Sequence, residues 1–261
     1  MKKKIHDFEV VDNRALGLDY FAIRLKCPVA FETIEPGQFV EALVSNSATT
    51  YLRRPFSIYD VDYEKNEMSL LIKKVGDGTR ALADLKKGEI LNMVYPLGNT
   101  FTIRGEGKAL LVGGGVGIAP MFMLARKLSA AGLRPDVLIG GRSAADVLEP
   151  EIYAPYAHVH VATDDGSMGE KGTVVQHSVF SENLSAYSAI YACGPDPMMR
   201  AVAKGAELQN IPCEVSLENT MACGMGACLC CVVETTEGNK TTCVEGPIFD
   251  TRSLTWKTKT H

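Results

Sequence analysis

The sequence lacks a long apolar run, an excess of basic residues and an apolar leader segment. Its longest uncharged stretch, residues 109–125, is shorter than the ~20 residues that a membrane span needs, and its glycines are grouped. The net charge is −4, whereas proteins that grip nucleic acid or anionic membranes are usually basic. Lys2, Lys3 and Lys4 are followed by further charged residues, so export is not indicated. We therefore expect a cytoplasmic protein whose partners include neither nucleic acid nor a membrane.

Disorder is also disfavoured, and cysteine is the residue in excess. Hydrophobic residues make up 46% of the 261 positions and charged residues 22%, which is typical of an ordered chain of one large or two ordinary domains. Of eight cysteines, four fall within residues 223–231, and Cys243 follows soon after. In a protein that is not exported, clustered thiols are more often metal ligands than disulfides. The sequence thus indicates thiol chemistry near its C-terminus.

The first hundred residues predict a small closed antiparallel β-barrel. Segments rich in Val, Ile, Leu, Tyr and Phe are separated by turn signals such as Glu35-Pro36-Gly37 and Gly76-Asp77-Gly78. The expected strands cover residues 19–26, 38–44, 56–59, 68–75 and 89–94, and one helix is expected over residues 79–85. Short strands at near-regular intervals favour a barrel over an open sheet.

From about residue 108 the pattern changes to alternating strands and helices. The expected strands, residues 109–112, 136–139, 158–162 and 189–192, lack alternating polarity, as when both faces of a sheet are covered. The expected helices cover residues 119–131, 173–180 and 197–209. This pattern predicts a doubly wound parallel sheet that binds its ligand at the carboxyl ends of the strands. We expect three parts: a barrel domain over 1–104, an α/β domain over 105–212 and a cysteine-rich module over 213–261.

The cysteine spacing points to an iron–sulfur cluster. Cys223, Cys228 and Cys231 form the pattern C-x4-C-x2-C, and Cys243 follows at a distance, which is the plant-type [2Fe–2S] arrangement. Gly224 and Gly226 lie inside the loop, where the backbone must turn sharply and can aim N–H groups at the sulfurs.

Two questions about this module stay open. A structural zinc site is the alternative, although zinc sites prefer paired cysteine knuckles over a tight triplet with one distant partner. Cys230 competes with Cys231 for one ligand position, and the spacing favours Cys231. Residues 232–236 and 240–244 flank Glu237-Gly238-Asn239, a hairpin that would return Cys243 to the cluster.

Glycine-rich turns follow two strands of the predicted sheet. The first runs from strand to helix through Gly113, Gly114, Gly115 and Gly117, where backbone can approach a pyrophosphate at a helix N-terminus. It departs from the strict G-x-G-x-x-G pattern, and tight strand–helix packing explains such a turn equally well when it stands alone. A second turn, Cys193-Gly194-Pro195, follows a later strand. Two such turns on parallel strands would face one ligand crevice.

The barrel carries further groups suited to an anionic cofactor. Arg53 and Arg54 precede Ser57 at the start of a strand, and an arginine can clamp a pyrophosphate while a serine reaches a flavin nitrogen. Gly78 and Thr79 lie where the helix is expected to begin, a second anion site of the same kind. The plainer alternatives are a solvated pair of charges and a helix N-cap.

Taken in order, these motifs resemble a known superfamily. Residues 54–57, 78–79, 113–120 and 193–195 are similar to the ferredoxin reductase-type flavoproteins. With the cysteine module, residues 52–55, 96–99, 163–167 and 218–226 narrow the resemblance to electron-transfer subunits of NAD-dependent (class 1B) dihydroorotate dehydrogenases. The similarity spans almost the whole chain and is weakest after Asp250.

The resemblance implies which residues hold each cofactor. One FAD per chain would be held by residues of the barrel: Arg54, Pro55, Phe56, Ser57, Leu71, Ile72, Lys73, Gly78 and Thr79. NAD, a diffusible acceptor, would lie over the two glycine-bearing turns, at Gly113, Gly114, Gly115, Gly117, Cys193 and Gly194. One [2Fe–2S] cluster would be ligated by Cys223, Cys228, Cys231 and Cys243. Phe56 stands where many relatives have tyrosine, so a phenol hydrogen bond to the flavin is absent.

The resemblance also implies electron routing in pyrimidine biosynthesis. A partner subunit would oxidise dihydroorotate at its own FMN, in a heterotetramer with two copies of each chain. Electrons would pass singly through the cluster to FAD and leave as hydride to NAD⁺. No residue needs to act as an acid or base, and Cys193 is the one candidate near the hydride path; a core thiol is the alternative.

Two other interpretations use the same modules. One assigns a different partner protein, and the other assigns a different class of protein. A related NADH-dependent ferredoxin:NADP oxidoreductase or a sulfide/sulfur reductase would use the same cofactors with another partner. A zinc-stabilised, nucleotide-binding regulator would be no enzyme at all, and it would lack flavin and iron–sulfur absorption. Residue evidence also leaves NAD and NADP open, because Arg142 can meet a 2′-phosphate, stack on adenine or face solvent.

Overall fold

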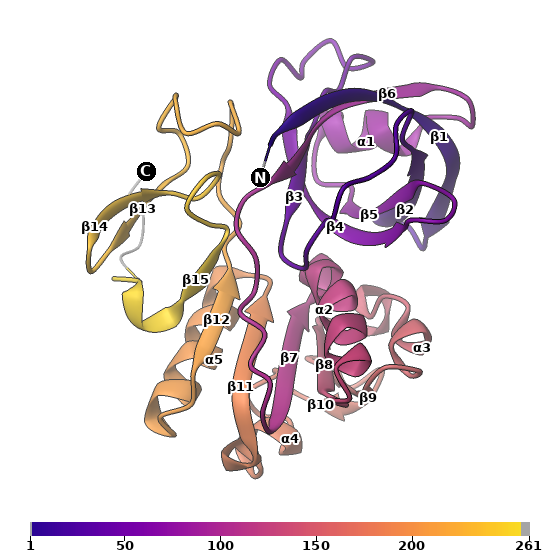
Figure 1. The fold of residues 1–261 in the computed structure, drawn as a ribbon. Helices are drawn as coiled ribbons and strands as arrows, with labels where there is room; N and C mark the ends of the chain where they lie inside the picture. Colours follow the sequence, from indigo (N-terminus) through magenta and orange to yellow (C-terminus); the bar gives the residue numbers. More distant parts are fainter. Residues whose placement is uncertain (1, 257–261) are drawn as a thin grey trace.

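The computed structural model describes residues 2–256. The first part of the chain forms a closed six-stranded antiparallel barrel, drawn in indigo to violet in Figure 1. Strands follow the order β1-β2-β5-β4-β3-β6 around it, and helix α1 (Asp77–Ala83) connects β5 to β6. The strands are β1 (Lys4–Leu16), β2 (Tyr20–Lys26), β3 (Phe39–Ala42), β4 (Arg54–Asp62), β5 (Glu67–Lys73) and β6 (Ile90–Leu97).

Alternation of side chains along the strands explains both the core inside the barrel and the contact of the barrel with the α/β domain. Along β5, Met68, Leu70 and Ile72 are buried inside the barrel, as the period of two in a strand requires. Leu71 points the other way and joins the core of the α/β domain. Tyr59 on β4 does the same and lies 5.4 Å, centroid to centroid, from the Phe122 ring. A continuous apolar core therefore fixes the barrel against the α/β domain.

The predicted barrel is confirmed, and one of its strands was missed. β1 has no counterpart among the expected segments, because only Phe8 and Val10 along it are buried and its other side chains are largely polar or charged. Such a strand has little apolar alternation for a sequence pattern to detect. Helix α1 starts at Asp77, two residues before the expected position.

The α/β domain is a seven-stranded sheet in the order β10-β9-β8-β7-β11-β12-β15. All pairings are parallel except that of β12 with β15. The strands are β7 (Lys108–Gly114), β8 (Asp136–Gly141), β9 (His158–Thr163), β10 (Glu170–Lys171), β11 (Tyr187–Cys193), β12 (Cys213–Ser216) and β15 (Ile248–Asp250). The helices are α2 (Ala119–Ala130), α3 (Pro150–Tyr153), α4 (Ser178–Ser181) and α5 (Asp196–Leu208), with 3-10 turns at Gly115–Ile118, Ala144–Asp146, Leu184–Ala186 and Thr251–Ser253.

Both faces of this sheet are covered, as a doubly wound fold requires. Leu111 and Ile139 pack with α2 on one face, and Leu110 and Leu138 pack with α5 on the other. The predicted helix over residues 173–180 is wrong in most of its length: only its last turn forms, as α4. The preceding residues form a turn instead, in which Val174 packs against the sheet beside Gly140.

The cysteine-rich segment is anchored in the sheet. β12 precedes it and β15 follows it, and the two strands pair with each other through Ser216 and Ile248. Between them lies the hairpin of β13 (Val232–Thr235) and β14 (Gly238–Thr241), drawn in yellow in Figure 1. The three-part division at residues 104 and 212 stays a prediction, with two strands of the third part completing the sheet of the second. No helix within residues 2–256 is long and apolar enough to cross a membrane.

Candidate functional site

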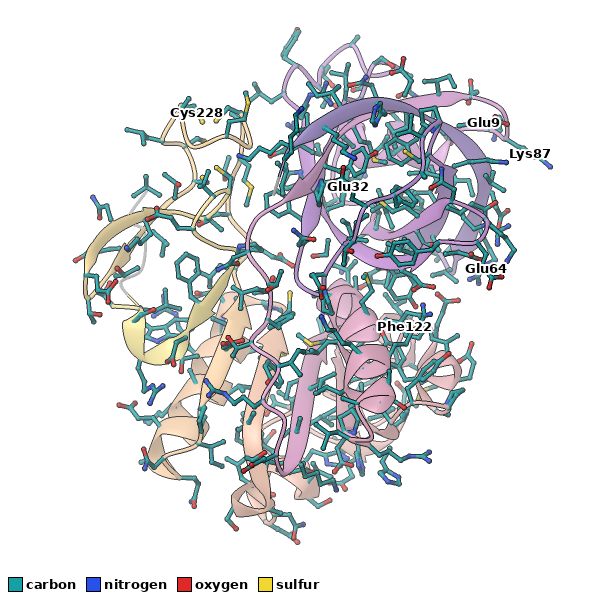
Figure 2. All side chains as sticks on the ribbon, in the orientation of Figure 1. Glu9, Glu32, Glu64, Lys87, Phe122 and Cys228 are labelled. Carbon is teal, nitrogen blue, oxygen red and sulfur yellow. The ribbon has the colours of Figure 1, made fainter. Side chains whose placement is uncertain are left out.

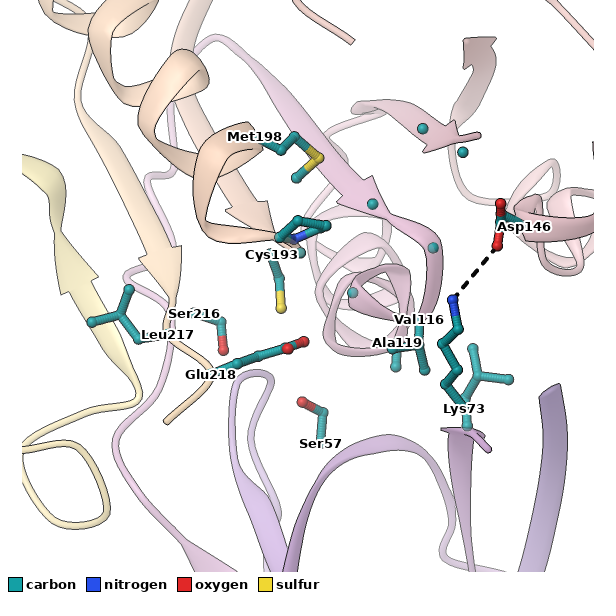
Figure 3. A pocket seen from close by; sticks show the side chains of 18 of the residues that line it. Ser57, Lys73, Val116, Ala119, Asp146, Cys193, Met198, Ser216, Leu217 and Glu218 are labelled. Carbon is teal, nitrogen blue, oxygen red and sulfur yellow. Dashed lines mark ion pairs between the residues drawn. The ribbon is translucent and has the colours of Figure 1, made fainter. Parts of the chain in front are cut away.

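A cavity of about 1100 Å³ lies where the barrel meets the sheet. Strands β4 and β5 form one wall, the carboxyl ends of β7, β8, β9 and β11 form another, and residues 216–221 form a third. This is the edge where α/β folds bind ligands. A single small molecule typically occupies roughly 300–1,000 Å³, so the space suits two groups side by side. Figure 3 shows Ser57, Cys193 and Glu218 converging on it from the three walls.

Most of the predicted cofactor-binding residues line this cavity. From the barrel they are Pro55, Phe56, Ser57, Leu71, Ile72, Lys73 and Thr79, and from the α/β domain they are Gly114, Gly115, Gly117, Cys193 and Gly194. Motifs that lie far apart in the sequence therefore share one space. Their individual roles toward FAD or NAD stay predictions.

Arg54, Gly78 and Gly113 do not line the cavity wall. The Arg54 guanidinium donates to the backbone carbonyl of Leu52, at 3.0 Å, so it would have to turn to reach a phosphate. A Cβ on Gly78 would lie 3.0 Å from the Thr50 side chain, and one on Gly113 would lie 2.5 Å from Ile118 Cδ1. These two glycines allow close packing directly behind the lining.

Arg53 and Thr79 are already engaged within the barrel. Arg53 donates to the backbone carbonyl of Glu41 at 3.1 Å and to Asn92 Oδ1 at 2.5 Å, so it is not the solvated charge of the plainer alternative. Thr79 Oγ1 accepts hydrogen bonds from the N–H groups of Val75 and Gly76, at 2.9 and 3.1 Å. The N-cap of α1 is Gly76, which corrects the alternative that Thr79 is the cap.

The two glycine-bearing turns are neighbours because β7 and β11 pair in parallel, with Gly113 opposite Cys193. A Cβ on Gly117 would lie 2.4 Å from the carbonyl oxygen of Cys193. A Cβ on Gly114 would lie 2.6 Å from Met198 Sδ. A side chain at Gly117 would collide with the backbone of the opposite turn, and one at Gly114 would collide with Pro195 of that turn and with Met198 in α5. The glycines thus let two backbones meet and leave their amide groups beside the cavity.

Sequence reasoning missed the contact that closes one end of the cavity. The Tyr20 hydroxyl, on β2, donates to Asp146 Oδ1 at 2.5 Å, and Lys73 Nζ lies 3.8 Å from the same oxygen; Figure 3 marks the Lys73 pair with a dashed line. Burial alone would raise the pKa of Asp146, but the Tyr20 hydrogen bond and the charges of Lys73 and Arg142 outweigh it and lower that pKa. No local pattern signals a contact between such distant segments.

A carboxyl and a thiol with raised pKa values face each other across the cavity. Burial raises the pKa of the Glu218 carboxyl. Burial, reinforced by the charge of Glu218, raises the pKa of the Cys193 thiol far above its usual value. Cys193 is therefore a neutral thiol at physiological pH, without the thiolate that a nucleophile needs. Its side chain both lines the cavity and belongs to the core, while its place near the hydride path stays a prediction.

The predicted cluster ligands lie in and beside the loop of residues 223–231, which we call the thiol loop; Figure 2 labels Cys228 at its outer edge. Three backbone N–H groups point at sulfur atoms. Those of Met225 and Gly226 lie 3.4 Å from Cys223 Sγ and 3.2 Å from Cys243 Sγ, and that of Cys243 lies 3.4 Å from Cys231 Sγ. Amide groups aimed at sulfur are the environment that iron–sulfur clusters use.

The four sulfurs fall into two pairs. Backbone N–H groups of Met225 and Cys228 lower the pKa of Cys223 to about 6, and the Cys228 thiol adds to this. Burial and a hydrogen bond with Cys231 raise the pKa of Cys243 to about 12. Within residues 2–256 no three His, Cys, Asp or Glu side chains are already arranged to hold a metal ion. The donor set suits iron, while its closure into one four-sulfur site stays a prediction.

The surroundings distinguish Cys231 from Cys230. Cys231 is buried, and its backbone carbonyl accepts hydrogen bonds from Asn219 and from the Thr242 hydroxyl, at 3.1 and 2.8 Å. Cys230 is exposed. The predicted hairpin is confirmed as β13 and β14, and it returns Cys243 beside Cys231 in the turn that follows. The choice of Cys231 over Cys230 as a cluster ligand stays a prediction.

Comparison with known proteins assigns each part of the chain. Residues 7–101 match the oxidoreductase FAD-binding domain, residues 111–204 the oxidoreductase NAD-binding domain, and residues 218–255 the iron–sulfur cluster binding domain of dihydroorotate dehydrogenase B. The chain is 37% identical to the dihydroorotate dehydrogenase B (NAD(+)) electron transfer subunit of Bacillus velezensis, over 95% of this chain and 97% of that protein. This chain belongs to the family of dihydroorotate dehydrogenase B electron transfer subunits.

Further similarities support this family. The subunit of the same name from Geobacillus kaustophilus is 35% identical, over 92% of this chain and 94% of that protein. The solved structure of an NADH-dependent reduced ferredoxin–NADP oxidoreductase superposes with a TM-score of 0.85 and 30% identity, over 95% of this chain and 90% of that one. The predicted fold class and the flavin, nicotinamide and iron–sulfur modules of this electron transfer subunit are thus confirmed.

Proposed function

We propose that this electron transfer subunit carries electrons that a separate FMN-containing subunit removes from dihydroorotate, and that it delivers them to NAD⁺. The observation that carries the proposal is the path of residues 216–221. They line the cavity and lead directly into the thiol loop, so the two sites are joined by one short segment. We propose Cys223, Cys228, Cys231 and Cys243 as the cluster ligands.

The cavity residues divide between two occupants. Pro55, Phe56 and Ser57 on β4 would hold the flavin against the barrel, with Leu71–Lys73 on β5 beneath it, and Thr79 fixes the start of α1 at the same wall. The turns at Gly114–Gly117 and Cys193-Gly194 would receive the nicotinamide nucleotide on the sheet side. FAD, when bound, supplies the conversion between one-electron transfer with a cluster and hydride transfer with a nicotinamide.

The protein's own contribution is position and the exclusion of water. Cys193, neutral and buried, presents a small, weakly polar surface beside the place where the two rings would meet. Glu218 and Ser216 are the labelled polar groups nearest to its sulfur in Figure 3, and Ser57 lies beyond them. Burial raises the pKa of the Glu218 carboxyl and so favours its neutral form there. Hydride transfer itself then needs no charged acid or base.

The experiment is a spectrum followed by two assays on the purified chain. Flavin and iron–sulfur absorption bands should both appear, and NADH should reduce artificial acceptors. Dihydroorotate should be oxidised only after the native FMN subunit, captured by co-purification, is added; we expect a complex with two copies of each chain. A colourless or zinc-loaded protein, or dihydroorotate turnover by this chain alone, would refute the proposal.

A second candidate partner follows from the similarity to the NADH-dependent ferredoxin–NADP oxidoreductase structure. Such a partner would give NADP-linked ferredoxin activity in the co-purified complex, without oxidation of dihydroorotate. We favour NAD over NADP because the relatives that match over most of the chain are named for NAD(+). The co-purified complex assayed with both substrates and both nucleotides separates the two candidates.

A further inference from the structure

A buried carboxyl group lies outside the cavity. Glu41, on β3, has 0% exposure, and neither of its carboxylate oxygens has a hydrogen-bond partner within residues 2–256. Arg53 acts on this carboxyl electrostatically, but its guanidinium donates its hydrogen bonds to the backbone carbonyl of Glu41 and to Asn92. An unpaired buried carboxylate is costly, and an apolar side chain of similar volume would serve the fold at least as well. Packing therefore does not explain this residue.

The Glu41 side chain faces the thiol loop. A Cβ placed on Gly224 would lie 3.1 Å from Glu41 Cγ and 3.9 Å from Cδ, so the carboxyl group lies against the residue that follows Cys223. The surroundings are dry, because Phe39, Val94 and Leu97 of the barrel form one apolar cluster with Met221, Cys231 and Cys243. Glu41 thus lies in the apolar wall between the barrel and the loop.

The other charges around this wall are cationic and have other contacts. Lys3 Nζ donates to the carbonyl oxygen of Gly224, at 3.0 Å, on the same residue that Glu41 packs against. The guanidinium groups of Arg53 and Arg54 act on the Glu41 carboxyl through space. The Cys223 thiol is close enough to act on it in the opposite direction.

We propose that Glu41 sets the reduction potential of the iron–sulfur cluster from the barrel side, through the field of its carboxylate across the thiol loop. The proposal rests on the proposed function, because it requires a cluster on the cysteines of this loop. A negative charge in a dry wall is weakly screened. Reduction adds an electron to the cluster, and iron–sulfur potentials respond to nearby charge and hydrogen bonds. The carboxylate therefore disfavours the reduced cluster and lowers its potential, which favours onward transfer to the flavin.

The test is a potentiometric titration of the cluster in the holoprotein, followed by the EPR signal of its reduced form. Glu41→Gln removes the charge with little change in volume, and Glu41→Asp keeps it. The measurement is made at pH 9, because burial and Cys223 together raise the pKa of Glu41 to about 7 against the opposing effect of Arg53. We expect a positive shift of the midpoint potential in Glu41→Gln, and a smaller shift in Glu41→Asp.

The matched control is Glu9→Gln, which makes the same change of net charge on the exposed outer side of β1, far from the loop (Figure 2). Solvent screens that charge, so the potential should not move. A fully iron-loaded Glu41→Gln protein with the wild-type potential would overturn the proposal. So would loss of iron from both Glu41 variants with FAD retained, because Glu41 would then be a folding residue. Wild-type protein without iron or a cluster signal would instead refute the cluster assignment itself.

Discussion

The cavity and the thiol loop are built in opposite ways. The cavity is walled by strands of two rigid units, and glycines such as Gly114 and Gly117 bring its backbone turns into contact. The thiol loop contains no strand or helix between residues 223 and 231. Side-chain hydrogen bonds link the thiols of Cys223 and Cys228, and those of Cys231 and Cys243. Apolar packing between the two units creates the cavity. We expect metal–sulfur bonds to join the proposed ligands into one site, as is usual where metal binding completes folding.

The strongest test of this difference is to remove one ligand. Cys228→Ser should abolish the iron–sulfur absorption and leave the flavin bands, because the barrel does not depend on the loop. Absorption spectra and iron analysis of the purified protein measure both. Cys230→Ser is the matched control and should keep its iron. Full iron in the Cys228 variant, or loss of iron in the Cys230 variant, would contradict the ligand set.

The converse test disturbs the cavity and spares the loop. In Gly117→Ala the new methyl group would lie 2.4 Å from the carbonyl oxygen of Cys193, so the two turns must separate. Overpacking of this kind costs about 1–3 kcal/mol, and we expect NADH to bind about tenfold more weakly with iron content unchanged. Titration with NADH measures the affinity. Gly105→Ala, where nothing lies within 4 Å of a Cβ, should bind NADH like the wild type; equal weakening in both would count against the turn.

The rate at which each thiol is alkylated should distinguish the exposed thiol loop from the buried cavity wall. In iron-free protein at pH 8, iodoacetamide should modify the exposed thiols Cys228 and Cys230 within minutes. Cys193 and Cys213 should stay unmodified, because burial raises the pKa of both thiols, that of Cys213 to about 12. Mass spectrometry of the digested protein reads each site, and a denatured sample should show all of them modified. Rapid labelling of Cys193 in folded protein would show that the cavity wall opens.

The smallest expected effect is on the pH dependence of thermal stability, through His177 at the start of α4. His177 Nδ1 accepts a hydrogen bond from the Val179 N–H, at 3.1 Å, and burial, with His160, lowers the pKa of His177 below 6.5. Since the folded state resists protonation, the stabilisation is present above pH 6.5 and is lost as pH falls below it. Between pH 7 and 5 we expect the Tm of wild type to fall more than that of His177→Asn, by about 1–2 °C. Equal losses by calorimetry would contradict the role of His177.

Local patterns predicted what local chemistry determines. The apolar residues of β5 between two turn signals marked a strand, and the glycine turn after β7 marked a ligand edge. β1 escaped because a barrel strand with two buried residues has almost no apolar period. The helix expected before α4 failed because Val174 is held against Gly140 by the sheet, and tertiary packing overrides helical periodicity there.

The missed site residues share a different cause. Asp146 has a partner on β2, and Glu41 lies against Gly224. Each contact joins segments that only the finished fold brings together. Cysteine spacing selected the ligand candidates, but it carried no information about the barrel residue behind them. The chemistry inside a motif was therefore predictable, and the surroundings that tune it were not.

The chain leaves the seven-stranded sheet and returns to it at two neighbouring positions. The chain departs at Ser216 and returns at Ile248, and these residues are paired across two antiparallel strands. In topological terms, the segment between these two residues is an insertion between paired strands. Residues 217–221 and Pro247 line the cavity, so a shortened insert would have to keep them and omit only the cysteine-bearing part of the segment. The product would be a flavin–nicotinamide reductase without its one-electron outlet, and the same two attachment points would accept a different redox module.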